Sequence, residues 1–462
     1  MKLFAAQLNY RAIAEEFQVP TDFSPELVDA AAHATDRFAD QRRDARDIEF
    51  VTIDPPGSKD LDQAVHIERT PDGFRVHYAI ADVAAFIEPG SALEEESLRR
   101  GQTIYLPDEP ARLHPRPLSE GSASLLPRVD RPAVLWTFDL DEAGEVTRSH
   151  VERALVRSRE RLDYEGVDLE LRAGDVHPSI EYLPEVGRLR ERSSLRREAI
   201  NLRMPSQRVV RDEDGRYELI IEPRPPIMDY NSEISLLTGM VAGQMMQAAG
   251  HGLLRTLRPA SPRSVAEFRV EARALGYEIG DEPVGAFLQG VDADTPRGMA
   301  LMREAQALLR GSGYGSVEAG DAEVHAGVGG YYAHVTAPLR RLVDRFATEH
   351  CLAIAAGTET PSWVTERHAA VLESMERTGA LASKVDRAAM DLTEATVLQP
   401  WVGENFDAVV LQTNADSARI LLTDPPVLST TRGTPEVGTG VKVTLTTADP
   451  ETRTVDFAWP AD

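Results

Sequence analysis

The spacing of hydrophobic and polar positions changes along the chain, and each change predicts a different kind of element. In residues 1–47, apolar positions such as Tyr10, Ile13 and Phe17 recur three or four residues apart, which is typical of short helices. We therefore predict a small N-terminal helical region. A lid packed on the rest of the protein is the favoured interpretation, and half of a helix-turn-helix is the alternative.

From Ile48 the spacing becomes that of strands. Alternation predicts strands over residues 48–54, 64–68, 74–80 and 133–140, with a Pro-Asp-Gly turn between the second and the third. Residues 151–200 are rich in Arg and Glu at helical spacing, which predicts helix with a solvated face. Further helices are predicted over residues 233–256, 262–276, 296–311, 337–357 and 364–398. Region 48–398 is therefore expected to be α+β, with a mixed sheet and helices.

After Pro400 the pattern consists of short alternating segments separated by turn residues. The segments FDAVVLQ, SARILLT and VKVTLTT predict strands, and so short a run of strands is typical of a small OB-type β-barrel. The expected organisation is a helical region over 1–47, a large α+β domain over 48–398 and a barrel over 399–462.

Composition narrows the class of protein. The chain has 462 residues, of which 42% are hydrophobic and 27% charged, a balance typical of a globular protein. The longest apolar stretch, residues 234–250, is interrupted by Ser, Thr and Gln, so we expect a buried helix and no membrane span. The single cysteine, Cys351, excludes an internal disulfide framework and a multi-cysteine metal cluster. We therefore expect a cytoplasmic protein with Cys351 in its core.

Charge gives a second constraint. The formal net charge of −25 argues against a protein that coats nucleic acid non-specifically. Lysine occurs only at positions 2, 59, 384 and 442, so nearly all basic residues are arginines. Arginine forks suit phosphate recognition, and the sequence therefore remains compatible with a local basic channel.

The densest chemical signal is VTIDPPGSKDLDQAV at residues 51–65. Asp54 ends a predicted strand, and Asp60 and Asp62 follow in one tight loop. Carboxylates placed in this way can converge on Mg²⁺, which prefers oxygen ligands, and two such ions can assist phosphodiester hydrolysis. Taken alone, the pattern is equally compatible with an Asp-rich surface turn.

This segment resembles the "TIDP-x3-KDLDDA" signature of the RNB domain in the RNase II/RNase R family. Residues 77–119 resemble the family's "IADVS-x-YV-x-PGS" and "R-G-x-S-x-YL" stretch, SLLPRVDRPAV at 124–134 follows, and YYAHVTAPLRRLVD at 331–344 resembles "Y-x-HFTSPIRRY-x-D". The resemblance implies a processive, Mg²⁺-dependent 3′→5′ exoribonuclease, with Mn²⁺ as the alternative cofactor. Such an enzyme hydrolyses single-stranded RNA to nucleoside 5′-monophosphates.

The resemblance also implies roles for individual residues. Asp54, Asp60 and Asp62 match three acidic metal ligands, whereas the fourth acidic position is Gln63 here. Arg340 matches the arginine that contacts the scissile phosphate. The remaining RNA-binding candidates are Tyr105 and Tyr164, which match aromatic contacts, Glu233, which matches a sensor of the 2′-hydroxyl, and Arg341 and Asp386.

Two other functions remain open from the sequence. Because a neutral amide at position 63 should bind Mg²⁺ less well than a carboxylate, the chain is alternatively an RNA-binding family member with weakened or lost catalysis. A DNA-binding protein that uses its N-terminal helices is the third reading. His325, His334 and His350 lack the spacing of a metal site, and His334 is expected to be a structural hydrogen-bonding residue. No obligate protein partner is implied, and we expect a monomer.

Overall fold

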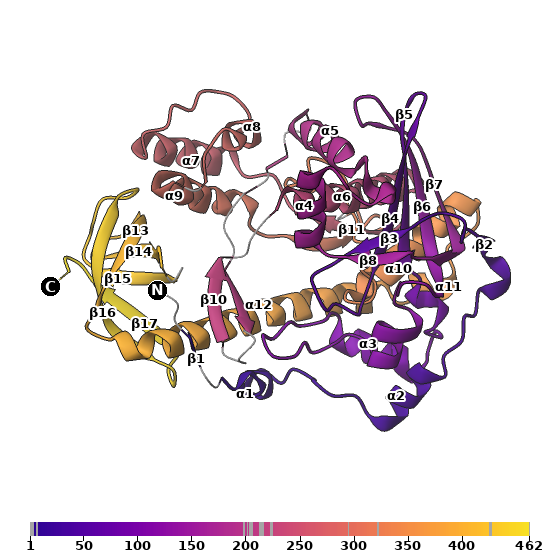
Figure 1. The fold of residues 1–462 in the computed structure, drawn as a ribbon, viewed down its shortest axis with the longest axis horizontal. Coiled ribbons are helices and arrows are strands. Elements are labelled where there is room, and N and C mark those ends of the chain that lie inside the picture. The colour runs from indigo at the N-terminus through magenta and orange to yellow at the C-terminus, as the bar shows by residue number, and fades with distance from the viewer. Residues whose placement is uncertain are drawn as a thin grey trace.

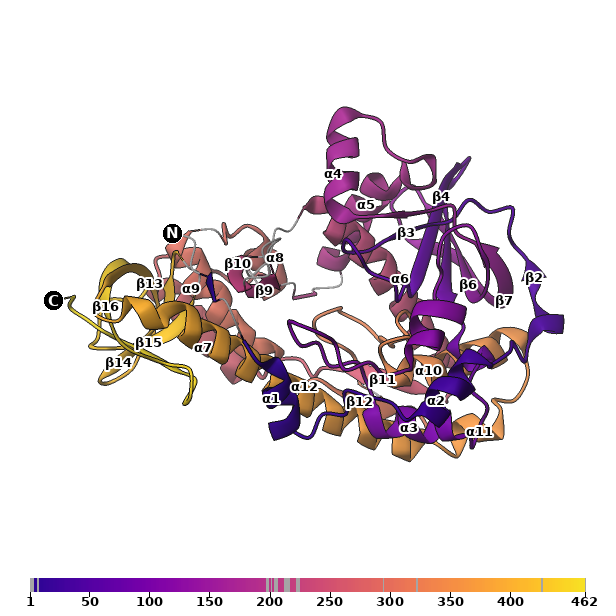
Figure 2. The same ribbon diagram turned by 60° about the horizontal axis from the view of Figure 1, so that its bottom comes forward.

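The protein, described here by a computed structural model, has two lobes that are joined by a long helix, α12 (Figures 1 and 2). The structure describes residues 4–5, 8–196, 199–200, 202, 207–211, 217–221, 225–293, 295–320, 323–424 and 427–461. The described helices are α1 (Tyr10–Glu16), α2 (Pro25–Ala32), α3 (Ala92–Arg100), α4 (Tyr164–Ala173), α5 (Leu183–Arg196), α6 (Pro226–Ala249), α7 (Pro262–Ala274), α8 (Val284–Gln289), α9 (Pro296–Ala305), α10 (Leu342–Ala356), α11 (Ser362–Thr365) and α12 (His368–Leu398).

The larger lobe is built on a seven-stranded sheet with the order β2-β7-β6-β5-β4-β3-β8. Its strands are β2 (Arg43–Asp44), β3 (Val51–Ile53), β4 (Gln63–Thr70), β5 (Gly73–Ala81), β6 (Asp130–Asp141), β7 (Val146–Arg157) and β8 (Glu160–Leu162). Neighbours from β3 to β7 pair antiparallel, whereas β2 and β8 join the edges parallel to β7 and β3. The sheet is therefore mixed, which confirms the predicted α+β class.

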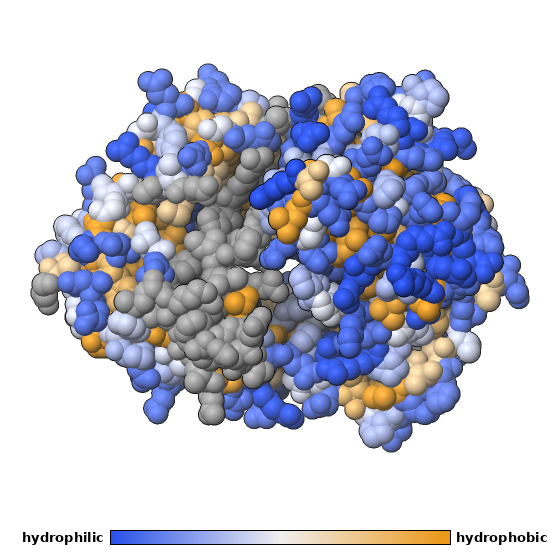
Figure 3. All heavy atoms as spheres, in the orientation of Figure 1, coloured by the Kyte–Doolittle hydropathy of each residue, from blue (hydrophilic) through white to orange (hydrophobic). Residues whose placement is uncertain are grey.

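Both faces of this sheet are buried, because successive side chains of a strand point to opposite faces. On β6, Trp136 lies in a core with residues of α6 and α10, and its neighbour Leu135 lies in a separate core with residues of α2 and α3. The strand end that carries the acidic motif is thus fixed between two packed layers. Figure 3 shows that hydrophilic residues cover most of the visible outer surface of this lobe.

Helix α12 links the two lobes through its length. It has 31 residues and so extends over roughly 46 Å. Val371 and Met375, near its start, lie in the core of the sheet lobe, whereas Val397 and Leu398, at its end, lie in a core shared with the barrel and α1. The helix therefore couples the position of the barrel to that of the sheet.

The smaller lobe confirms the predicted C-terminal barrel. Five strands close it in the order β13-β14-β15-β17-β16, with β15 parallel to β17 and the other pairs antiparallel. They are β13 (Asn405–Thr413), β14 (Ser417–Leu422), β15 (Leu428–Arg432), β16 (Gly440–Asp449) and β17 (Thr454–Ala458). This is consistent with an OB fold, and α7 to α9 lie beside it (Figure 1).

Two small sheets complete the described elements. Strand β11 (Leu253–Thr256) pairs with β12 (Gly313–Ser316), and β10 (Tyr217–Ile221) pairs with both β1 (Phe4–Ala5) and β9 (Gln207–Arg211). The sequence pattern indicated none of these strands. They are short and lack the clear alternation of the large sheet.

The helical interpretation of residues 151–200 is wrong for its first part, which forms the end of β7 and then β8; residues 197–198 lie outside the described residues. Val151 and Val156 are buried from β7, and its charged residues face neighbouring strands. For example, Glu152 pairs with Arg43 of β2, with 2.9 Å between Oε1 and Nη1. Alternating Arg and Glu residues serve cross-strand pairs as well as helical ones, so the pattern was ambiguous.

Several other helix boundaries differ from the prediction: α6 begins at Pro226, and the helix predicted over 364–398 is divided into α11 and α12. Helix α6 ends at Gly250, whose φ of +77° is the left-handed conformation that terminates helices, so residues 253–256 form a strand instead. Residues 337–341 form a turn before α10, and this turn contributes to the candidate site described below.

The N-terminal helices pack on different parts of the protein. Tyr10 of α1 lies against α12, where its hydroxyl is 2.6 Å from Thr393 Oγ1, and Ala31 of α2 lies in the core with α3. Both helices thus cover other elements, as a lid does. Within the described part of the chain, no helix combines the length and apolar character needed to cross a bilayer.

Candidate active site

The three predicted metal ligands lie where β3 ends and β4 begins. Asp54 follows β3, its amide bonded to Leu162 O at 3.1 Å, and Asp62 immediately precedes β4. The loop between them is anchored because Leu61 N donates to Ser124 Oγ at 3.0 Å. The acidic segment is therefore held by the sheet on both sides, which is the local basis for convergence of the carboxylates.

Burial and mutual proximity distinguish this group from a surface turn. Burial raises the pKa of Asp54 to about 6 and that of Asp62 to about 8, and the carboxylate of Asp60 contributes to both shifts. Burial also raises the pKa of Asp60. The raised pKa values mean that ionisation of these three acidic groups is unfavourable without a nearby cation. A divalent ion stabilises the charged carboxylates, so such a site favours a hard cation. The donor set therefore fits Mg²⁺ or Mn²⁺.

Arg340 reaches this group from a turn that is distant in the sequence. Leu339 N donates to Asp62 Oδ1 at 2.8 Å, and Arg340 Nε lies 3.4 Å from Asp62 Oδ2. The backbone of Arg340 is fixed as well, because its carbonyl accepts from Thr103 N at 2.9 Å. The side chain of Arg340 is 45% exposed, so the guanidinium borders the carboxylates and remains accessible to a ligand.

Arg341 has a different environment from its neighbour. Its guanidinium donates twice to the fully buried carboxylate of Asp344, through Nε at 2.9 Å and Nη2 at 2.8 Å. The same carboxylate accepts from Ala337 N at 2.7 Å. Asp344 thus locks the turn that carries both arginines. It belongs to the motif YYAHVTAPLRRLVD, but motif matching alone assigned it no role.

The side chain of Gln63 makes a hydrogen bond to the backbone of a distant segment. Its Nε2 donates to Thr336 O at 2.6 Å, which ties the acidic segment to the start of the Arg340 turn. A carboxylate cannot donate this bond, so an ionised acidic residue at position 63 would lose it. Of the amide's two polar atoms, only the oxygen is suited to a metal ligand.

A pocket of about 430 Å³ lies beside these groups. Its lining residues are Gln102, Thr103, Tyr105, Arg340, Arg341, Ala382, Ser383 and Asp386. Tyr105 is 53% exposed there, so its ring is accessible for stacking on a base. The structure therefore brings Tyr105, Arg340, Arg341 and Asp386 to one pocket, with Asp386 contributed by α12.

Tyr164 and Glu233 come from a neighbouring part of the lobe. Tyr164 begins α4, and its hydroxyl accepts from Asn231 Nδ2 at 3.2 Å. Burial and the nearby Asp54 carboxylate raise the pKa of Tyr164, which places this ring on the Asp54 side of the carboxylates. Glu233 is buried two residues after Asn231 on α6 and does not line the pocket.

His334 makes a hydrogen-bonding contact, as predicted. Its Nδ1 lies 2.8 Å from the hydroxyl of Tyr314 on β12. His350 was given no role in metal binding by its sequence spacing. The structure nevertheless places His350 in a separate group with His251 and Glu318, outside the acidic segment.

The chain is similar in sequence to known protein families. A family model described as the RNB domain matches residues 42–350, and one described as the RNase II-type exonuclease C-terminal S1 domain matches residues 404–459. Ribonuclease R of Chlamydia trachomatis is 27% identical over 419 residues, which are 86% of this chain and 58% of that protein. The chain thus spans a little over half the length of this curated relative.

Solved structures share the fold at low sequence identity. Mycoplasma genitalium RNase R in complex with ribose-methylated single-stranded RNA matches with a TM-score of 0.88 and 17% identity, over 97% of this chain and 77% of that one. Yeast Ssd1, described as a pseudonuclease, matches with a TM-score of 0.74 and 15% identity, over 92% and 55%.

Proposed function

The chain belongs to the RNB-domain family, and we propose that it is a processive 3′→5′ exoribonuclease that hydrolyses single-stranded RNA to nucleoside 5′-monophosphates with Mg²⁺ or Mn²⁺. The observation that carries this proposal is that the carboxylates of Asp54, Asp60 and Asp62 all interact electrostatically with Arg340, which borders an accessible pocket. These groups would supply a cation site and a phosphate-binding fork at one place, which suits metal-assisted hydrolysis of a phosphodiester.

In this mechanism Asp54, Asp60 and Asp62 would hold the metal. When bound, it would lower the pKa of a water and stabilise charge on the phosphodiester oxygens. Asp62 Oδ1 is oriented by Leu339 N, so this carboxylate presents its other oxygen toward Arg340 and the pocket. Arg340 would donate to a non-bridging phosphate oxygen, where its fixed positive charge stabilises the negative charge that develops during attack.

The pocket residues would hold the RNA. Tyr105 would stack on a base, which favours every nucleotide to a similar extent. Tyr164 would contact the terminal nucleotide, and Glu233, buried nearby, would help to distinguish the 2′-hydroxyl. Asp386 would contact the 3′ end from α12.

The direct test is incubation of a 5′-labelled single-stranded RNA with the protein and Mg²⁺. Products that shorten stepwise from the 3′ end support the proposal, and their loss in Asp62→Asn assigns the activity to this site. Uncleaved RNA at high protein concentration would contradict it. A duplex DNA of the same length is the matched substrate control, which should remain intact.

An RNA-binding protein without cleavage is the second candidate, because Gln63 replaces an acidic residue and a pseudonuclease shares the fold. Tight RNA binding with no products in either Mg²⁺ or Mn²⁺ would favour it. Gln63→Asp separates weak metal binding from an inactive site. A higher cleavage rate in this variant indicates that the amide limits the reaction, whereas an unchanged rate indicates that another ligand fills its place.

A further inference from the structure

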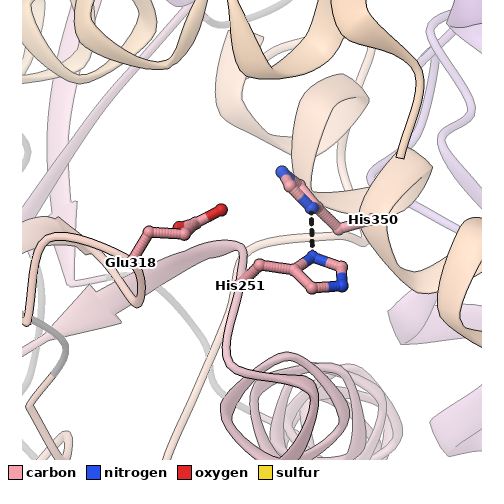
Figure 4. Close-up of side chains that lie close together, drawn as sticks. All are labelled: His251, Glu318 and His350. Carbon is pink, nitrogen blue, oxygen red and sulfur yellow. Dashed lines mark hydrogen bonds between the residues drawn. The ribbon is translucent and has the colours of Figure 1, made fainter. Parts of the chain in front are cut away.

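A second group of polar side chains, separate from the acidic segment, includes a residue in the second half of α10. Figure 4 shows His251 and His350 facing each other, with Glu318 directed toward them from a separate segment. His251 follows the end of α6, Glu318 follows β12, and His350 lies in the second half of α10. Three segments far apart in the sequence therefore converge here.

The distance between the two histidine nitrogens is close to that between metal ligands. His251 Nδ1 and His350 Nδ1 are 3.0 Å apart, and one ligand atom from each of the two histidines and Glu318 lies within 4.8 Å of the others. Ligand atoms of a tetrahedral zinc site, with bonds of about 2 Å, are separated by roughly 3.3 Å. The separation of the two nitrogens is close to this value, and the exposed side chain of Glu318 would move toward them to complete the site.

The surroundings would orient the ligands. The other ring nitrogen of His350, Nε2, lies 2.6 Å from His368 Nε2 at the start of α12. Glu318 Oε2 accepts from Ser316 Oγ at 2.7 Å and from Gly252 N at 3.1 Å. Such contacts to the outer atoms of ligands are a regular feature of metal sites, because they fix the ring orientation and the histidine tautomer.

The alternative is a chain of hydrogen bonds between neutral imidazoles. Because two Nδ1 atoms face each other, one of them must carry a proton and the other must accept it. The tautomer of His350 then decides whether its Nε2 donates to His368 Nε2 or accepts from it. Thr360 Oγ1 lies 3.2 Å from His350 Nδ1 and 3.5 Å from His251 Nδ1, so a hydroxyl also faces this gap. A cation bound to both Nδ1 atoms would use the lone pair of each nitrogen and would keep the proton of His350 on Nε2, from which it donates to His368.

We propose that His251, His350 and Glu318 form a binding site for a first-row transition-metal ion, with zinc as the best match to two imidazoles and one carboxylate. The site is distinct from the acidic group of Asp54 and Asp62 in both its elements and its ligand chemistry, since nitrogen ligands select zinc over Mg²⁺. A bound ion ties the end of α6, the segment after β12 and α10 together. It therefore braces the helix whose first turn holds Asp344.

The test uses the full chain loaded with Zn²⁺ and then dialysed against zinc-free buffer that contains excess Mg²⁺, which displaces zinc from the acidic group. We expect about one zinc per chain to remain, measured by mass spectrometry of the metal. His251→Gln and Glu318→Gln should each weaken retention by about tenfold or more. His33→Gln, which changes an exposed histidine elsewhere, is the matched control and should retain zinc like the unaltered chain.

A second readout separates loss of the site from loss of the fold. Zinc should raise the unfolding temperature of the unaltered chain and of His33→Gln, but not that of His251→Gln, whose metal-free unfolding temperature reports whether it folds. Equal zinc retention in all variants, or no retained zinc in the unaltered chain, would overturn the proposal in favour of the hydrogen-bonded imidazole chain. Neither result depends on ribonuclease activity.

Discussion

Substitution by alanine is expected to cost much more stability at Arg341 than at its neighbour Arg340, where it should mainly lower the rate of RNA cleavage. The side chain of Arg341 is largely buried and donates twice to the fully buried carboxylate of Asp344. Removal of one partner from a buried pair destabilises a protein by about 3–5 kcal/mol, because an uncompensated charge remains. Asp344 also keeps its bond from Ala337 N, so we expect Arg341→Ala to lower the free energy of unfolding by about 3 kcal/mol.

Arg340→Ala removes a more exposed side chain. Its contact with Asp62 is 3.4 Å long, and burial raises the pKa of Asp62 to about 8, so this carboxylate can take up a proton when the guanidinium is lost. We therefore expect a loss of stability below about 1 kcal/mol. The rate of RNA cleavage should nevertheless fall about 100-fold or more, which is typical when a donor to a reacting oxyanion is removed.

The assays are urea unfolding at pH 7.5 and single-turnover cleavage of a 5′-labelled RNA. Arg340→Lys is the matched variant that keeps the charge but loses the planar fork, so an intermediate rate is expected. The reasoning is refuted if Arg340→Ala loses as much stability as Arg341→Ala. It is equally refuted if Arg341→Ala unfolds at the same urea concentration as the unaltered chain.

Three further predictions follow from the site. Gln63→Glu replaces the donor to Thr336 O with an acceptor, so the free energy of unfolding should fall by about 1–3 kcal/mol; an unchanged urea midpoint would contradict this. Tyr105→Ala should weaken binding of single-stranded RNA in EDTA by about 1–3 kcal/mol, measured by fluorescence anisotropy, whereas Tyr105→Phe should bind normally. Burial lowers the pKa of His114 to about 3, so its stabilising contribution is present above pH 6.5 and is lost as the pH falls toward 3. When the pH falls from 7.5 to 5, the free energy of unfolding of His114→Gln should therefore decrease by about 2 kcal/mol less than that of the unaltered chain. An equal decrease in both proteins would contradict this prediction.

Sequence periodicity predicted well those elements in which buried and exposed positions alternate regularly. The barrel strands alternate regularly, and β13, β14 and β16 lie where the segments FDAVVLQ, SARILLT and VKVTLTT predicted strands. The charged strand β7 was mistaken for helix because its arginines and glutamates make pairs with neighbouring strands, and such long-range partners leave no local signal. The boundary at Gly250 depended on a left-handed backbone conformation that hydrophobic spacing does not report.

The candidate site shows the same division between local and long-range information. Asp54, Asp60 and Asp62 are close in the sequence, so they could be identified as one candidate group. Their spacing alone was equally compatible with a surface turn, and the resemblance to the RNB domain favoured a metal site. The bond from Gln63 to Thr336 O and the pairing of Arg341 with Asp344 could not be inferred in this way, since they depend on how two distant segments meet. The histidine group was missed for the same reason, as His251, Glu318 and His350 share no sequence motif.

The strong negative charge of the chain is compatible with RNA binding, because carboxylates that hold a divalent cation can present positive charge to a phosphate. Asp54 and Asp62 each have a raised pKa because burial and nearby carboxylates penalise their charged forms. Such groups are stable together when they hold protons or a divalent cation, and an ion held there presents positive charge toward the pocket. Carboxylates at this position would thus strengthen phosphate binding, and Arg340 would add a fixed positive charge beside them. The net charge of −25 describes mainly the solvated surface, whereas the few groups around the pocket decide whether a phosphodiester can bind.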